Sequence, residues 1–126
     1  MDYNSAKSYL LSKPEAIEDY PFGPDVAVFK ILDKMFATLG EEKGVARMNL
    51  KCDPVEATAL RDIFEAVIPG YHMNKQHWNT VILDGSMPVG EIERQIDNSY
   101  SLVVKGLTKA KKRGLEVRHG KSNIYK

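Results

Sequence analysis

The sequence has few cysteines, no long apolar segment and no phosphate-binding glycine motif, and each of these absences excludes a class of protein. Cys52 is its single cysteine, so no intrachain disulfide can form and a hydrophobic core must hold the fold together. The first residues contain no apolar leader, and no apolar run approaches membrane-spanning length. No glycine loop for phosphates and no dinucleotide fingerprint is present. These absences predict a soluble, cytoplasmic protein without a membrane anchor or a bound cofactor.

Size and composition indicate a single globular domain. The chain has 126 residues, of which 43% are hydrophobic and 28% are charged, close to the average for globular proteins. We find no internal repeat and no low-complexity segment. We therefore expect one α+β unit over residues 1–107, followed by a basic C-terminal extension over residues 108–126.

The charge is unevenly divided along the chain, although the net charge is only +1. Residues 105–126 contain eight lysines and arginines against one glutamate, a balance of +7, which leaves −6 for residues 1–104. A basic segment on an acidic body is typical of some polyanion-binding proteins, but it also occurs as a solvated tail that keeps a protein soluble. The candidate binding residues of this tail are Lys109, Lys111, Lys112 and Arg113.

Apolar periodicity and turn residues predict the element order α-β-β-β-α-β-α, with about three helices on one face of an antiparallel sheet. Short links between the first three strands imply antiparallel pairing, because a parallel pair needs a long crossover. The second helix has Asp53 as its N-cap and Pro54 at its first position, and we expect it to bury Leu60, Ile63, Phe64 and Val67. The predicted helices cover about 3–12, 54–67 and 88–107, and the predicted strands 26–31, 35–39, 45–51 and 78–83.

The predicted strand over residues 45–51 alternates between apolar and polar side chains. Ala46, Met48 and Leu50 are expected to face the helices. Arg47, Asn49 and Lys51 would then face outward, together with Val28 and Lys30 from the first strand. An outer sheet face with these cations and few acids is typical of sheets that bind nucleic acid, although lysine and arginine there can also serve solubility alone.

Four segments carry a resemblance to a known family. They are Tyr20–Gly23, Leu50–Pro54, Pro69–Val81 and Leu83–Gly85, and they occur in the family's order over roughly residues 1–107. On these segments the chain resembles the MmcQ/YjbR family. The resemblance implies a frataxin-like or double-wing fold, with helices on an antiparallel sheet, and DNA binding as the family's proposed activity.

The loop over residues 72–78 is the second candidate contact with nucleic acid. It combines imidazoles, amides, one cation and an indole, which can donate to phosphate oxygens or stack on a base. The same loop could instead bond to its own backbone, with Trp78 capping the core. The complete set of candidate binding residues in the body is Lys30, Arg47, Lys51, His72, Asn74, Lys75, His77 and Trp78.

Catalytic and metal sites find little support. His72, His77 and Cys52 match no standard zinc spacing. Cys52 continues the inward series of Met48 and Leu50, so we expect a buried, unreactive thiol rather than a nucleophile. Frataxin-like iron handling needs several converging carboxylates, which the first helix lacks.

We therefore predict a non-enzymatic protein with no metal that binds nucleic acid, with DNA as its partner. The alternative is a protein-interaction module without catalytic activity, docking through its acidic helices or its outer sheet face.

Overall fold

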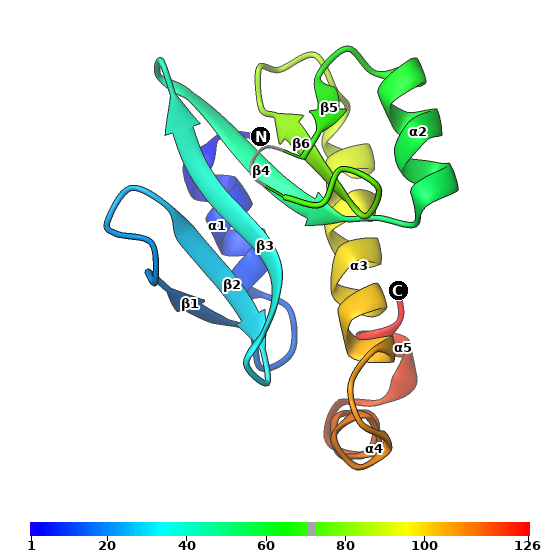
Figure 1. The fold of residues 1–126 in the computed structure, drawn as a ribbon. Helices are drawn as coiled ribbons and strands as arrows, with labels where there is room; N and C mark the ends of the chain where they lie inside the picture. The colour runs from blue at the N-terminus through cyan, green and yellow to red at the C-terminus, as the bar shows by residue number, and fades with distance from the viewer. Residues whose placement is uncertain (71–72) are drawn as a thin grey trace.

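The alternating strands form one antiparallel sheet of six strands in the order β1-β2-β3-β4-β6-β5 (Figure 1). The computed structural model describes residues 1–70 and 73–126. The strands are β1 (Ile17–Asp19), β2 (Ala27–Ile31), β3 (Lys34–Glu42), β4 (Val45–Lys51), β5 (Val67–Pro69) and β6 (Trp78–Ile82). The helices are α1 (Tyr3–Leu11), α2 (Pro54–Ile63), α3 (Val89–Lys105), α4 (Lys109–His119) and α5 (Lys121–Ile124).

The helices are distributed unequally around the sheet. Helix α3 packs against β2, β3 and β4, and α1 packs beside it against β3, so both lie behind the sheet in Figure 1. Helix α2 lies next to β5 at the end of the sheet, and α4 and α5 lie at the C-terminal end of α3. Within the described residues no helix covers the opposite side of the sheet, which we call the outer face.

Register and burial in β4 agree with the predicted alternation. Ala46, Met48 and Leu50 are buried under the helices, whereas Arg47 and Lys51 point to the outer face. The three consecutive antiparallel strands expected over residues 26–51 are confirmed by the pairing of β2 with β3 and of β3 with β4.

The two hairpin turns are tighter than predicted. Leu32 and Asp33 have φ of 45° and 68°, and Lys43 and Gly44 have φ of 52° and 80°. Positive φ at both central positions is typical of type I′ turns, whose twist matches that of the flanking strands. Strand β3 therefore continues through Gly40, which pairs with Arg47, instead of ending before a five-residue turn.

A β-bulge in β3 adjusts the sheet to α3. The register shifts between Phe29 and Lys30, so that Phe36 and Ala37 are both buried. Ser99 of α3 donates to the Phe36 carbonyl at 2.5 Å and accepts from the Lys51 amide at 2.8 Å. One buried hydroxyl thus satisfies backbone groups of both β3 and β4 where these strands diverge.

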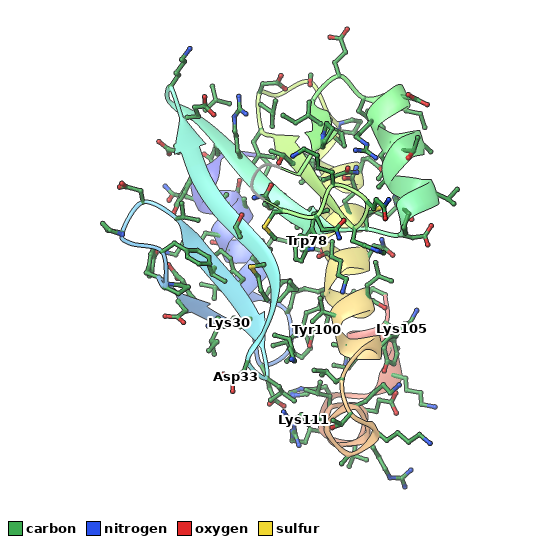
Figure 2. The ribbon with its side chains drawn as sticks, viewed as in Figure 1. Lys30, Asp33, Trp78, Tyr100, Lys105 and Lys111 are labelled. Atoms are coloured by element: carbon green, nitrogen blue, oxygen red, sulfur yellow. The ribbon has the colours of Figure 1, made fainter. Side chains whose placement is uncertain are left out.

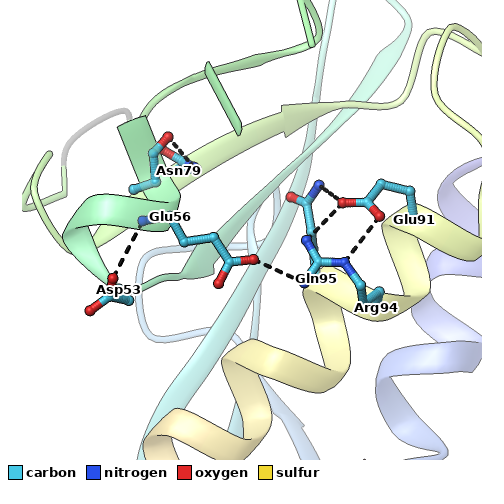
Figure 3. A network of polar contacts seen from close by, with 7 residues as sticks. Asp53, Glu56, Asn79, Glu91, Arg94 and Gln95 are labelled. Atoms are coloured by element: carbon cyan, nitrogen blue, oxygen red, sulfur yellow. Dashed lines mark hydrogen bonds and ion pairs between the residues drawn. The ribbon is translucent and has the colours of Figure 1, made fainter. Parts of the chain in front are cut away.

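The N-terminal cap of α2 follows the prediction, and α1 is capped in a similar way by Asp2. The Asp2 side chain accepts from the Ser5 amide, and the Asp53 side chain accepts from the amides of Val55 and Glu56. Helix α2 is joined to α3 by Arg94, which lies 2.9 Å from Glu56 and 2.8 Å from Glu91 (Figure 3).

The end of α2 differs from the prediction. The helix stops at Ile63, whose side chain is exposed, and Phe64 is extended. Val67, expected in the helix, belongs instead to β5, where it pairs with Val81. Its burial comes from the sheet and not from a helix face, which is why apolar spacing alone assigned it wrongly.

The element order contains the seven predicted elements and four more. Strands β1 and β5 are three residues each, too short for a periodic signal. Residues 108–126, expected as an extension, fold mainly into α4 and α5 and bury Leu115 and Ile124 completely. Among the described residues, no helix has the length and apolar character needed to cross a membrane.

Candidate nucleic-acid interface

Two of the predicted sheet cations are paired with carboxylates. The Lys30 ammonium lies 2.8 Å from the Asp19 carboxylate, which belongs to the unpredicted strand β1. Arg47 contacts Glu42 at 3.4 Å across the β3–β4 hairpin. Both cations do lie on the outer face as predicted, but these acids neutralise their charge.

Lys51 and Trp78 are brought together on the outer face. They are direct partners on β4 and β6, and both are half-buried. The Lys51 ammonium has no ion pair among the described residues. The Trp78 backbone is held by Gly70, whose amide donates to the Trp78 carbonyl at 2.9 Å. A Cβ at Gly70 would lie 2.9 Å from the Trp78 Cβ, so only glycine permits this approach.

The described part of the loop before β6 is organised by its own hydrogen bonds. The Asn74 side chain accepts from the Gln76 amide at 2.9 Å, and the Asn74 carbonyl accepts from the His77 amide at 3.2 Å. The Arg61 guanidinium donates to the Lys75 carbonyl at 3.3 Å. Lys75 and His77 are exposed, whereas His72 lies outside the described residues. Asn74 therefore has a structural task in this loop.

The densest group of cations lies between the last residue of α3 and the C-terminal residue of the chain. We call it the basic end (Lys105, Lys109, Lys111, Lys112, Arg113, Lys121 and Lys126). Lys109, Lys111 and Arg113 are exposed on α4, and the Lys112 ammonium lies 3.4 Å from the Lys105 carbonyl. None of these seven side chains forms an ion pair with a described residue. Figure 2 shows Lys105 and Lys111 at the basic end and Lys30 on the sheet.

The basic end is fixed to the body by its opposite side. Leu115 and Ile124 are fully buried. Arg118 and His119 both contact Glu15 at 2.7 Å, and the two contacts lower the pKa of this carboxyl group. The Tyr125 hydroxyl donates to Glu116, the one acid in α4 and α5. The cations are thus displayed by ordered helices and not by a free tail.

Cys52 and a metal site are the two other kinds of chemistry that the sequence analysis considered. Cys52 is buried, and burial raises the pKa of its thiol to about 11, so the thiol stays protonated near neutral pH. Outside residues 71–72, no group of three histidine, cysteine or acidic side chains is arranged to hold a metal ion.

Comparison with known proteins places the chain in a family. The YjbR family model matches residues 11–102. The chain belongs to the MmcQ/YjbR family. It is 38% identical to YbdF of Escherichia coli O157:H7 over 107 residues, which cover 85% of this chain and 88% of the relative. It is 33% identical to YjbR of Escherichia coli K12 over 113 residues, which cover 90% and 96%.

Solved structures share the fold. The crystal structure of the Deinococcus radiodurans protein DR2400 superimposes with a TM-score of 0.82 at 36% identity, covering 90% of this chain and 87% of that one. A Pseudomonas syringae protein superimposes with a TM-score of 0.72 at 32% identity, covering 82% and 99%. The α+β class and the antiparallel sheet are therefore shared with these relatives.

Sequence reasoning identified the basic end only in part. Four of its seven cations were predicted from the run of charge after Leu107. Lys105, Lys121 and Lys126 were not singled out, because only the packing of α5 against α3 and of α4 against α5 brings them to the same end of the molecule. The charge balance of residues 105–126 was the signal that could have found all seven.

Proposed function

We propose that the protein binds nucleic acid, DNA in the first place, and that the basic end holds the phosphate backbone without reading the sequence. The observation that carries the proposal is the set of seven basic side chains between the last residue of α3 and Lys126 that have no ion pair with a described residue. Most of the binding energy of a nonspecific complex comes from such contacts, because each neutralised phosphate releases condensed counterions.

The dimensions of α4 suit a phosphate backbone. A helix of 11 residues spans roughly 16 Å, and a duplex carries about nine phosphate charges over that length. Lys109 and Arg113 are four residues apart and therefore lie on one side of the helix. Their long side chains can reach successive phosphates along one strand.

Lys51, Lys75 and Trp78 form a second candidate contact at the β4–β6 end of the outer face. The indole is half-buried, so part of its ring remains available for stacking on an unpaired base. Lys30 and Arg47 are left out of the proposed interface, because Asp19 and Glu42 neutralise them.

The test compares two double variants by fluorescence anisotropy of a labelled DNA duplex. Lys109→Gln with Arg113→Gln removes two charges from α4, and Lys34→Gln with Lys43→Gln removes two exposed charges from the hairpin turns. At about 0.1 M salt, loss of two phosphate contacts should weaken binding by roughly 10- to 60-fold in the first variant alone.

If both variants lose the same amount of DNA affinity, the loss follows from net charge alone and α4 is not part of the interface. If the parent protein binds no duplex at low salt, the nucleic-acid proposal fails and the protein-interaction module takes its place.

A further inference from the structure

The outer face of the sheet contains a pocket of about 630 Å³. We call it the outer-face pocket and define it by six of its lining residues: Phe22, Met35, Thr38, Arg47, Asn49 and Met73. Its volume falls within the range of roughly 300–1,000 Å³ that is usual for small-molecule sites. Most of its lining surface is apolar, as is usual for such sites, and its polar side chains come from the neighbouring strands β3, β4 and β6.

The floor of the pocket is a cross-strand row. Thr38, Asn49 and Thr80 are direct partners on β3, β4 and β6, and all three side chains face outward. Thr38 is only 7% exposed and Thr80 only 2%, although no described helix covers this face. Phe22 and Met73 line the same pocket from the loops beside the row.

Three charged residues line the pocket, Glu41, Glu42 and Arg47, and Arg47 is the one with a buried donor that lacks a partner among the described residues. Its side chain is 34% exposed, and its contact with Glu42 is 3.4 Å, longer than the roughly 2.8 Å of a strong charge-assisted hydrogen bond. Its Nε donor is covered and has no acceptor among the described residues. Since an unsatisfied buried donor is unfavourable, a modest turn of the guanidinium toward a better acceptor would stabilise it.

Phe22 provides a second indication that the pocket can take an apolar group. Its side chain is 74% exposed at the rim, a high value for a large aromatic residue. An apolar group placed between Phe22, Met35 and Met73 would bury this ring together with the thioethers, which adapt readily to different shapes.

We propose that the outer-face pocket binds a small organic acid with an apolar or aromatic body. Its carboxylate would take the place of Glu42 on the Arg47 guanidinium, in the two-bonded geometry that arginine and carboxylates favour. The body would lie against Phe22, Met35 and Met73, and the Thr38 hydroxyl would supply a further polar contact on the floor.

This site does not depend on the proposed nucleic-acid function. The pocket is formed by β3, β4, β6 and the loops beside them, whereas the basic end lies between the last residue of α3 and Lys126. Arg47→Lys, which keeps the charge on this face, should weaken ligand binding and leave DNA affinity unchanged, so the two proposals can fail separately.

The test is a titration of the parent protein with phenylpropionate, phenylpropylamine and phenylpropanol, followed by amide chemical shifts in NMR spectra. These three probes share an aromatic body and differ in the charge of the head group. We expect saturable shifts with phenylpropionate, centred on Thr38, Gly40, Arg47 and Asn49, and much weaker shifts with the other two probes.

Variants of the two wall residues sharpen the result. Arg47→Met should weaken phenylpropionate binding at least tenfold, and Arg47→Lys, which keeps the charge but loses the fork, should weaken it less. Glu42→Gln should strengthen binding several-fold, because it removes the competing carboxylate. Thermal unfolding of each variant shows whether the fold is retained, and Arg47→Lys still tests the proposal if Arg47→Met does not fold.

Four outcomes would overturn the proposal. They are preferential binding of the amine, equal binding of all three probes, no saturable shift with any probe, and shifts of the same amides on raising the protein concentration without a probe. The last would assign the pocket to contact with a second copy of the chain.

Discussion

The cations of the body and those of the basic end have different surroundings. In the body, five of the lysines and arginines have a carboxylate partner, whereas in residues 105–126 Arg118 is the one lysine or arginine that pairs, among the described residues, with an acid. The body pairs are Lys7–Glu18, Lys13–Asp97, Lys30–Asp19, Arg47–Glu42 and Arg94–Glu56.

This difference shows that a cation at the surface is not always available to a ligand, because an ion pair can occupy it. Ion pairs at the surface contribute little to stability, typically about 0–1 kcal/mol, but they cancel the field that would attract a polyanion. In the body, acids therefore pair with neighbouring cations. At the basic end most cations have no such partner, so the unequal charge division of the sequence gives this end of the fold a positive charge.

The largest effect is expected at Lys13, the most deeply buried cation of the body. Its side chain is 2% exposed, its ammonium lies 2.5 Å from Asp97, and the rings of Tyr9 and Tyr100 lie 5.7 and 5.4 Å away. Asp97→Asn leaves this charge without its counterion, so the free energy of unfolding in urea should fall by about 3–5 kcal/mol. Adding Lys13→Met should restore most of that loss, and a loss below about 1 kcal/mol in the single variant would show that the pair is not buried.

The second prediction concerns the attachment of the basic end. Leu115 is fully buried, so Leu115→Ala should lower the free energy of unfolding by about 2–5 kcal/mol. Val117 lies two residues away and is exposed, so Val117→Ala should change stability by less than about 0.5 kcal/mol. Equal small effects of both changes on urea unfolding would mean that α4 is a loose tail.

The third prediction removes the carboxylates that pair with the two cations of the sheet. Asp19→Asn together with Glu42→Gln leaves Lys30 and Arg47 unpaired on the outer face, with a stability change of about 1 kcal/mol or less for each pair. DNA affinity should rise several-fold at low salt, because two more cations become available. An unchanged affinity would mean that the outer face does not approach the DNA.

The smallest expected effect is a pH dependence at Glu15. Arg118 and His119 lower the pKa of its carboxyl group below the ordinary value of 4.5. A carboxyl group whose pKa is lowered in the folded state stabilises the fold at pH values above its ordinary pKa. This contribution disappears as the pH falls through the lowered pKa. Unfolding curves of the parent and Glu15→Gln should therefore differ slightly at neutral pH and converge in acid, and a difference that grows in acid would contradict the assignment.

The sequence predicted those parts of the fold that have a regular local signal. The alternation of residues 45–51 predicted which side chains of β4 are buried, and Asp53-Pro54 predicted the start of α2. The short strands β1 and β5 carry no such signal, because three residues cannot show a period. In α4, Leu115-Glu116-Val117-Arg118 has strand-like alternation, but Thr108 caps a helix whose buried side packs on the body.

The candidate site was less predictable, because ion pairs depend on which strands become neighbours. Asp19 neutralises Lys30 across the β1–β2 pair, and no property of either residue alone indicates this contact. The outer-face pocket was not predicted either, since Phe22 and Met73 reach it from separate loops. Charge counting along residues 105–126, in contrast, needed no tertiary information.

The salt dependence of DNA binding tests the central claim most directly. The logarithm of the binding constant should fall linearly with the logarithm of salt concentration, with a slope of about −0.9 for each phosphate neutralised. Replacing Lys109 and Arg113 by glutamine should reduce the magnitude of this slope by about 1.8. If the double variant, still folded by circular dichroism, keeps the slope of the parent, α4 does not contact phosphates and the account of the basic end is wrong.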